Sequence, residues 1–185
     1  MDHNEEINCE ATYKRRRVGV VPISCPLSKR YSGLYLIERD LASIEILIGE
    51  SQKKGCISHV AKGLFVAITT IYWKCFADTR GRNRVVLNKK KYIKDESLMM
   101  VHEKIKDVRH NFSAHSGDIT FEKAKVFVLK GENGKPASTV VPVVFQANNA
   151  DAEFLEDIRN LVSHIKNNVS AEMSSIIETL KDKYC

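Results

Sequence analysis

Hydrophobic residues recur at every third or fourth position along several stretches of the chain, and this spacing predicts helices. The first helix is expected from Ser32, a suitable N-cap, to Gly49, a suitable C-cap. The second is expected from about Ile57 to Phe76, and its wide apolar surface should make it the most buried helix. The apolar positions of the first are Leu34, Ile37, Leu41, Ile44 and Ile48, and those of the second include Val60, Leu64, Phe65, Ile68, Ile71 and Tyr72.

A third helix is expected to begin at Asp95 and to stop at Ser116 and Gly117. Asp95 is a favourable N-cap, and the carboxylate of Glu96 in the first turn suits the positive end of the helix dipole. One face of this helix is apolar and should pack against the core; it is formed by Leu98, Met99, Val101, Ile105, Val108 and Phe112.

Beyond Gly117 the hydrophobic period changes to two, which is typical of strands. Lys125–Lys130 and Thr139–Gln146 predict a β-hairpin at about residues 121–147, in which Pro142 confines its strand to an edge or a bulge. A long final helix follows from Asn149 or Asp151 to about Asp182, and Ser170 leaves open a division into two helices. The expected fold class is mainly α, an antiparallel helical bundle with an added β-hairpin before a long C-terminal helix.

The size and composition of the chain fit one globular domain. With 185 residues, of which 43% are hydrophobic, it is long enough for one packed core and short for two. We assign residues 31–185 to this domain and residues 1–30 to a basic N-terminal arm that contains Lys14–Arg17. Pro22 and Pro26 exclude a continuous helix in the arm.

The five cysteines are scattered, without the close pairs of a metal site, and their odd number argues against a disulfide framework. We therefore expect reduced thiols and a cytoplasmic location, with Cys75 packed in the core. No segment reads as a signal peptide or a membrane span. No metal and no cofactor is predicted.

Positive charge is concentrated between Lys74 and Lys94, where eight basic residues face the single acid Asp78. We interpret Asp78–Asp95 as a long loop, and such loops inside compact domains are usually functional or mobile. Its basic side chains could contact the phosphate backbone of RNA, or could simply keep a solvated loop soluble. The candidate RNA-binding residues are Arg80, Arg82, Arg84, Lys89, Lys90 and Lys91.

The end of the third helix gathers residues suited to phosphate chemistry: Arg109, His110, Asn111 and His115. Together with Ser116 and Gly117, with the aromatic segment Ile71–Phe76 and with the Arg80–Arg82 turn, this motif resembles the abortive-infection-type branch of the HEPN (higher eukaryotes and prokaryotes nucleotide-binding) family. The resemblance implies a HEPN-like helical bundle and a metal-independent endoribonuclease that acts as a toxin or in phage defence. It also implies a homodimer, RNA as substrate, and a possible antitoxin protein as partner.

In this resemblance His115 is the general base or acid, Arg109 stabilises the phosphorane, and His110 or Asn111 positions the phosphate. His102, about two turns earlier, could assist the site, but it is interpreted as structural or exposed. At roughly 100° per residue, Arg109 and His115 lie about 120° apart on a regular helix. Either the helix loosens at Ser113 to Gly117, or two copies bring their motifs together about a two-fold axis. The alternative function is a non-catalytic module of the same fold that binds nucleotide or RNA, and a third reading is an oligomeric scaffold.

Overall fold

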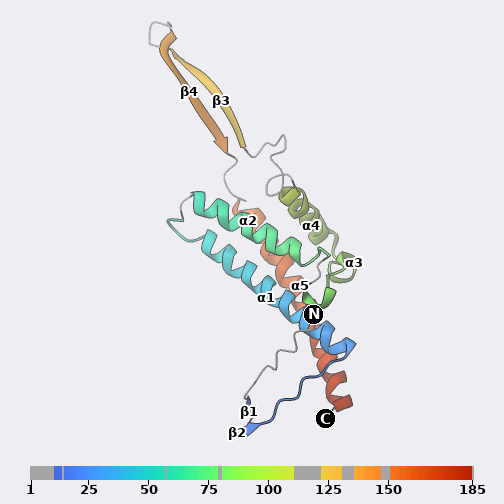
Figure 1. Cartoon of the computed structure of the whole chain (residues 1–185). Coiled ribbons are helices and arrows are strands. Elements are labelled where there is room, and N and C mark those ends of the chain that lie inside the picture. The colour runs from blue at the N-terminus through green and yellow to red at the C-terminus, as the bar shows by residue number, and fades with distance from the viewer. Residues whose placement is uncertain are drawn as a thin grey trace.

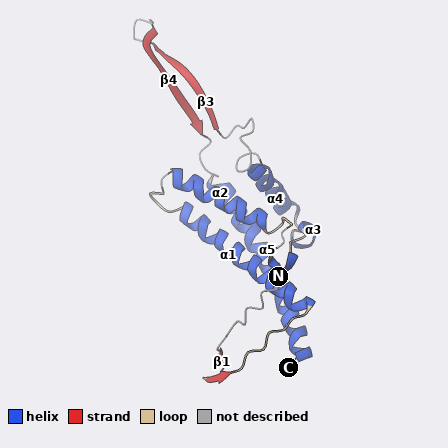
Figure 2. Ribbon diagram, viewed as in Figure 1, coloured by secondary structure: helices blue, strands red, loops and turns tan. Residues whose placement is uncertain are grey.

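Helices dominate the computed structural model, which describes residues 11–13, 15–56, 58–78, 81–110, 122–130, 136–146 and 151–184 (Figures 1 and 2). This confirms the mainly α prediction. The longer helices are α1 (Pro26–Ser51), α2 (Ser58–Lys74), α4 (Glu96–Val108) and α5 (Ala152–Tyr184). No helix among the described residues is both long enough and apolar enough to cross a bilayer.

The helix α1 packs against both α2 and α5, and α4 packs against α2 and α5 on the other side. The predicted apolar stripe of α1 is confirmed, because all five of its members are fully buried. By the share of its described residues that are buried, α2 is the most buried of the longer helices, as expected, although Val60 near its start is 48% exposed. The longer α5 contributes more buried residues in number: Phe154, Leu155, Ile158, Leu161, Val162, Ile165, Val169, Met173 and Ile176.

The start of α1 differs from the prediction. The helix begins at Pro26 rather than near Ser32, because Cys25 is its N-cap and Ser28 completes a capping box. The Cys25 sulfur accepts from the Ser28 backbone N–H at 3.4 Å, and the Ser28 hydroxyl oxygen accepts from the Cys25 N–H at 3.0 Å. A proline at the first helical position needs no hydrogen-bond donor, so Pro26 starts this helix.

The segment predicted as a loop between α2 and α4 contains two short elements, η1 (Arg82–Arg84) and α3 (Lys89–Tyr92). The side chain of Asn88 caps α3 by accepting from the Lys90 N–H at 3.0 Å. All three residues of η1 have positive φ angles, at 54°, 54° and 60°. Left-handed backbone costs about 1–2 kcal/mol per residue for side chains other than glycine, so the surrounding contacts must hold this turn in place.

The last helix is continuous. α5 runs through Ser170, and the hydroxyl of Ser170 donates to the carboxylate of Glu38 on α1. A hydroxyl that bonds another helix does not compete for its own backbone, and so Ser170 does not divide α5.

The β-rich segments form β3 (Glu122–Lys130) and β4 (Pro136–Gln146), which pair antiparallel with Val126 opposite Pro142. Each is an edge strand in this two-stranded sheet, which satisfies the constraint that Pro142 imposes. In Figure 1 the β3–β4 pair stands away from the helices. A second small pair, β1 (Ala11–Tyr13) and β2 (Arg16–Val18), lies in the N-terminal arm.

Candidate functional site

The helix that carries the motif is firmly anchored at its start and along its inner face. The carboxylate of Asp95 caps α4 by accepting from the Leu98 N–H at 3.1 Å, which confirms the predicted N-cap. Further along, Ile105 is fully buried and Val108 is 5% exposed. The chain therefore reaches Arg109 in a fixed direction.

The first two motif residues lie at the C-terminal end of α4. Arg109 is the C-cap, and its backbone N–H bonds to the carbonyl oxygens of Ile105 and Lys106. Its side chain is partly buried, whereas His110 is exposed. The other two candidates, Asn111 and His115, lie outside the described residues, and so does the predicted end of the helix.

The third histidine of the region, His102, lies inside the bundle and is 2% exposed. Its Nδ1 shares a 2.7 Å hydrogen bond with the hydroxyl of Tyr72 on α2, and the ring of Phe76 packs edge-on at 4.7 Å. Burial lowers the pKa of His102 and raises that of Tyr72. A neutral imidazole held in this aromatic contact is structural, in agreement with one of the two interpretations from the sequence.

The outer face of α4 bears a groove of about 600 Å³. Its apolar lining residues include the strongly exposed Met100, and its charged lining residues are Glu96, Glu103 and Asp107 with one base, Lys104. A second hollow, lined in part by Asp157 on α5, shares Met100 and Lys104 with it. This groove is acidic, so it does not suit phosphate.

Arg82, a candidate RNA-binding residue, points into the bundle. Its guanidinium pairs with the carboxylate of Asp40 on α1, and its side chain is 7% exposed. Lys74 approaches the same carboxylate at 3.3 Å. Arg82 therefore holds η1 on α1 and does not contribute to an exposed surface.

Close packing beneath η1 explains how its strained backbone is held. A Cβ atom added at Gly33 of α1 would lie 2.5 Å from the carbonyl oxygen of Arg82 and from the side chain of Val85. The side-chain amide of Asn83 donates to the carbonyl of Lys29 at 3.1 Å. Only glycine at position 33 allows the turn to come this close.

The three consecutive lysines of α3 differ in their contacts. Lys89 pairs with Glu103 of α4 at 2.5 Å, and Lys91 pairs with Glu172 of α5 at 2.5 Å. Both remain about half exposed, at 44% and 55%. Lys90 between them is exposed, as is Arg84, whereas Arg80 lies outside the described residues.

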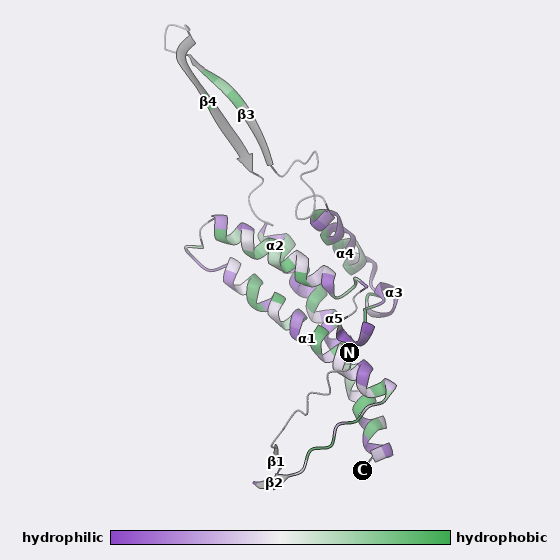
Figure 3. Cartoon of the chain, viewed as in Figure 1, coloured by the Kyte–Doolittle hydropathy of each residue, from purple (hydrophilic) through white to green (hydrophobic). Residues whose placement is uncertain are grey.

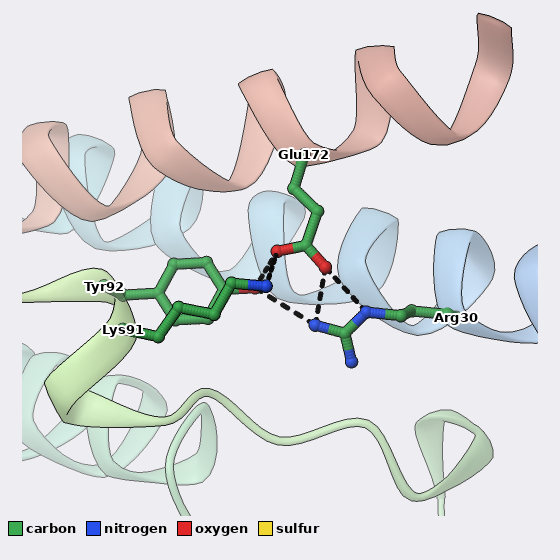
Figure 4. A network of polar contacts seen from close by, with 4 residues as sticks. All are labelled: Arg30, Lys91, Tyr92 and Glu172. Carbon is green, nitrogen blue, oxygen red and sulfur yellow. Dashed lines mark hydrogen bonds and ion pairs between the residues drawn. The ribbon is translucent and has the colours of Figure 1, made fainter. Parts of the chain in front are cut away.

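A polar network around Glu172 was not predicted from the sequence (Figure 4). Its carboxylate accepts from Arg30 of α1 at 2.6 Å, from the Tyr92 hydroxyl at 2.6 Å and from Lys91. Burial alone would raise the pKa of Glu172, but the hydrogen bonds from Lys91, Tyr92 and Arg30 outweigh it and lower the pKa to about 2. The separation of 142 residues between Arg30 and Glu172 leaves no local sequence signal for this contact.

These contacts define two surfaces, the exposed end of α4 with Arg109 and His110, and the exposed lysines of α3. Comparison of the chain with family models, with characterised proteins and with solved structures finds no match. Within the described part of the chain, three or more histidine, cysteine or acidic side chains never gather in a way that could hold a metal ion. These two surfaces and the motif are therefore the features of the chain that point to a function.

Proposed function

We propose that the chain is a metal-independent endoribonuclease with a HEPN-like antiparallel helical bundle, acting as a toxin or in phage defence. The observation that carries the proposal is the end of α4, where an arginine and an exposed histidine follow directly on a helix that is capped and buried along its inner face. A catalytic group is most effective when a rigid element fixes its position.

In the proposed reaction the RNA 2′-oxygen attacks the adjacent phosphorus and forms a 2′,3′-cyclic phosphate, as the bond from phosphorus to the 5′-oxygen of the next nucleotide breaks. His115 takes the proton from the 2′-hydroxyl or gives one to the leaving oxygen, since imidazole titrates near neutral pH. Arg109 donates hydrogen bonds to the phosphate oxygens as negative charge develops. His110 and Asn111 hold the phosphate in line.

Two copies are proposed to complete the site. Arg109 has helical φ and ψ angles of −62° and −43°, but Arg109 and His110 are π-helical, so the regular α-helix ends at Val108. On a regular α-helix Arg109 and His115 would point to different sides, and a second motif related by a two-fold axis would supply the missing group.

Purified protein incubated with labelled single-stranded and transfer RNA in EDTA tests the proposal. Arg109→Ala and His115→Ala should each reduce cleavage by about 100-fold or more, the usual contribution of a general acid or base. Arg39→Ala and His59→Ala change exposed residues on α1 and α2 and should cleave normally. Full cleavage by both motif variants would exclude the proposed site.

A second candidate function is supported by the lysines of α3. Lys90 is exposed and its neighbours are half exposed, so this short helix could bind the phosphate backbone of RNA without cleaving it. In this case RNA binding should fall with salt and with Lys90→Ala, yet survive His115→Ala. A titration of labelled RNA at two salt concentrations separates the two functions.

A further inference from the structure

One carboxylate holds two lysines between α3 and α4. Glu103 of α4 pairs with Lys89 of α3 at 2.5 Å and with Lys106 of its own helix at 3.5 Å. The three side chains are partly exposed, at 39%, 44% and 49%. Two positive charges share one negative charge, so the cluster keeps an excess of positive charge at the surface. In Figure 3 α3 and the C-terminal half of α4 are coloured mostly as hydrophilic.

Glu172 of α5 makes equivalent pairs on the other side of α3. It pairs with Lys91 of α3 at 2.5 Å and with Arg30 of α1 at 2.6 Å, and Figure 4 shows both side chains directed at its carboxylate. This cluster too has two positive charges and one negative charge. Lys90 of α3 lies between the clusters and is exposed. Together these side chains form a basic run from α1 to α4: Arg30, Lys91, Lys90, Lys89 and Lys106.

Lys106 connects the basic run to the motif at the end of α4. It lies three and four positions before Arg109 and His110, and residues at this spacing share one side of a helix. The wider π-helical turn at Arg109 and His110 preserves this, because residues four apart are still about one turn apart. At 1.5 Å per residue, Glu103 is about 9 Å from Arg109 along the helix axis. The two surfaces described above are therefore continuous.

The lysines held by Glu103 can turn to another anion at small cost. Exposed ion pairs contribute no more than about 1 kcal/mol each, because water screens them. A phosphate contact made by a lysine also releases a condensed counterion, which favours binding at low salt. Asp107, which lines the acidic groove, lies about 100° around α4 from Lys106. A polyanion is thus favoured along the basic run and disfavoured over the groove.

We propose that an RNA strand lies along the basic run, from the motif across Lys106 and Lys89 onto α3. The strand is then cut at the end of α4, while its neighbouring phosphates contact these two lysines and α3. An RNA strand fits better than an acidic peptide, because the run ends at residues suited to phosphate chemistry. The position of the cut rests on the proposed function, whereas the binding along the run does not.

Titration of a labelled oligouridylate of about ten nucleotides tests the binding, with His115→Ala in every chain so that RNA stays intact. Lys106→Ala and Lys89→Ala should each weaken binding by about threefold to tenfold at low salt and lower the slope of log K against log salt by about 0.7. A dinucleotide has one linking phosphate and should not distinguish Lys89→Ala from its parent. Lys181→Ala is the matched control, because Lys181 also pairs with an acid three residues earlier, at 2.7 Å on α5.

Equal affinities and equal salt slopes in the two run variants and in the control would overturn the proposal. Competition by polyglutamate as strong as that by unlabelled RNA would also overturn it, since the run would then accept any polyanion. If the chain with His115 intact cuts RNA, Lys106→Ala should raise KM by a similar factor and leave kcat unchanged, and an unchanged KM would contradict the proposal. RNA that binds through both lysines but is never cut would overturn the ribonuclease and support the binding run.

Discussion

Replacing Gly33 with alanine would test how α1 supports the left-handed turn η1. The added Cβ would lie 2.5 Å from the Arg82 carbonyl oxygen and from two carbon atoms of Val85, whereas ordinary contact begins near 3.4 Å. The obstructing oxygen belongs to the backbone, so no side-chain rotation relieves the contact. The turn must move away from α1, or the helix must bend.

The expected cost follows from two opposing terms. Overpacking a buried site costs about 1–3 kcal/mol, and loss of the buried pair between Arg82 and Asp40 would raise the cost toward 3–5 kcal/mol. The higher helix propensity of alanine stabilises a helix interior by about 1 kcal/mol relative to glycine, which offsets part of this cost. Gly33→Ala should therefore lower the free energy of unfolding by up to about 2 kcal/mol if the pair is kept, and by about 2–4 kcal/mol if it is lost.

Gly49→Ala is the matched control, because Gly49 lies in the same helix with nothing within 4 Å of an added Cβ. This change should be neutral or stabilise the fold by up to about 1 kcal/mol. Urea unfolding followed by circular dichroism measures both. For a chain of this size the two variants should differ in Tm by on the order of 10 °C.

Equal stability of the two alanine variants would refute the reasoning, since helix propensity would then be the only effect at either site. A large loss in both would also contradict it, because the loss would not depend on the approach of η1. Only a loss confined to position 33 fits the close contact with Arg82 and Val85.

Three further predictions concern buried charges. Burial lowers the pKa of His102 in the folded chain, so the unfolded chain binds this proton more readily. The free energy of unfolding should therefore fall as the pH drops below about 6.5. In urea titrations at a series of pH values, His102→Gln should show a smaller slope of this free energy against pH. Glu172 has a lowered pKa, so its contribution is present above pH 4.5 and is lost toward pH 2; Glu172→Gln should cost about 1–3 kcal/mol at pH 7 and remove that acid dependence. Asp40→Ala leaves the guanidinium of Arg82 without its buried partner and should cost about 3 kcal/mol in urea unfolding, whereas adding Arg82→Met should recover part of the loss.

Regular spacing of hydrophobic residues predicted the longer helices because it is a local property. The five apolar positions of α1 are assigned to the core from their spacing alone, and all five are fully buried: Leu34, Ile37, Leu41, Ile44 and Ile48. The cap at Asp95 was likewise predicted from one residue and the sequence that follows it. The start of α1 was missed because cysteine is an unusual N-cap, and only the contact with Ser28 shows its role.

Contacts between distant residues could not be predicted. The sequence predicts that Arg82 binds RNA, but its pairing with Asp40 gives it a structural role. Nothing in the basic segment between Lys74 and Lys94 indicates that pairing. For the candidate site, the sequence predicted that Arg109 and His110 lie at a helix end, and the structure has both at the end of α4. The positions predicted for Asn111 and His115 remain predictions, because both residues lie outside the described part of the chain.

The lysines of α3 are bound to carboxylates on both sides, Lys89 to α4 and Lys91 to α5. A polyanion that takes up these two ammonium groups must displace Glu103 and Glu172, and so it exchanges one set of partners for another. Binding at α3 would then release contacts that join α3 to its neighbouring helices. The cost of breaking these contacts lowers the affinity itself, and the thermal stabilisation by such a ligand should follow that lower affinity.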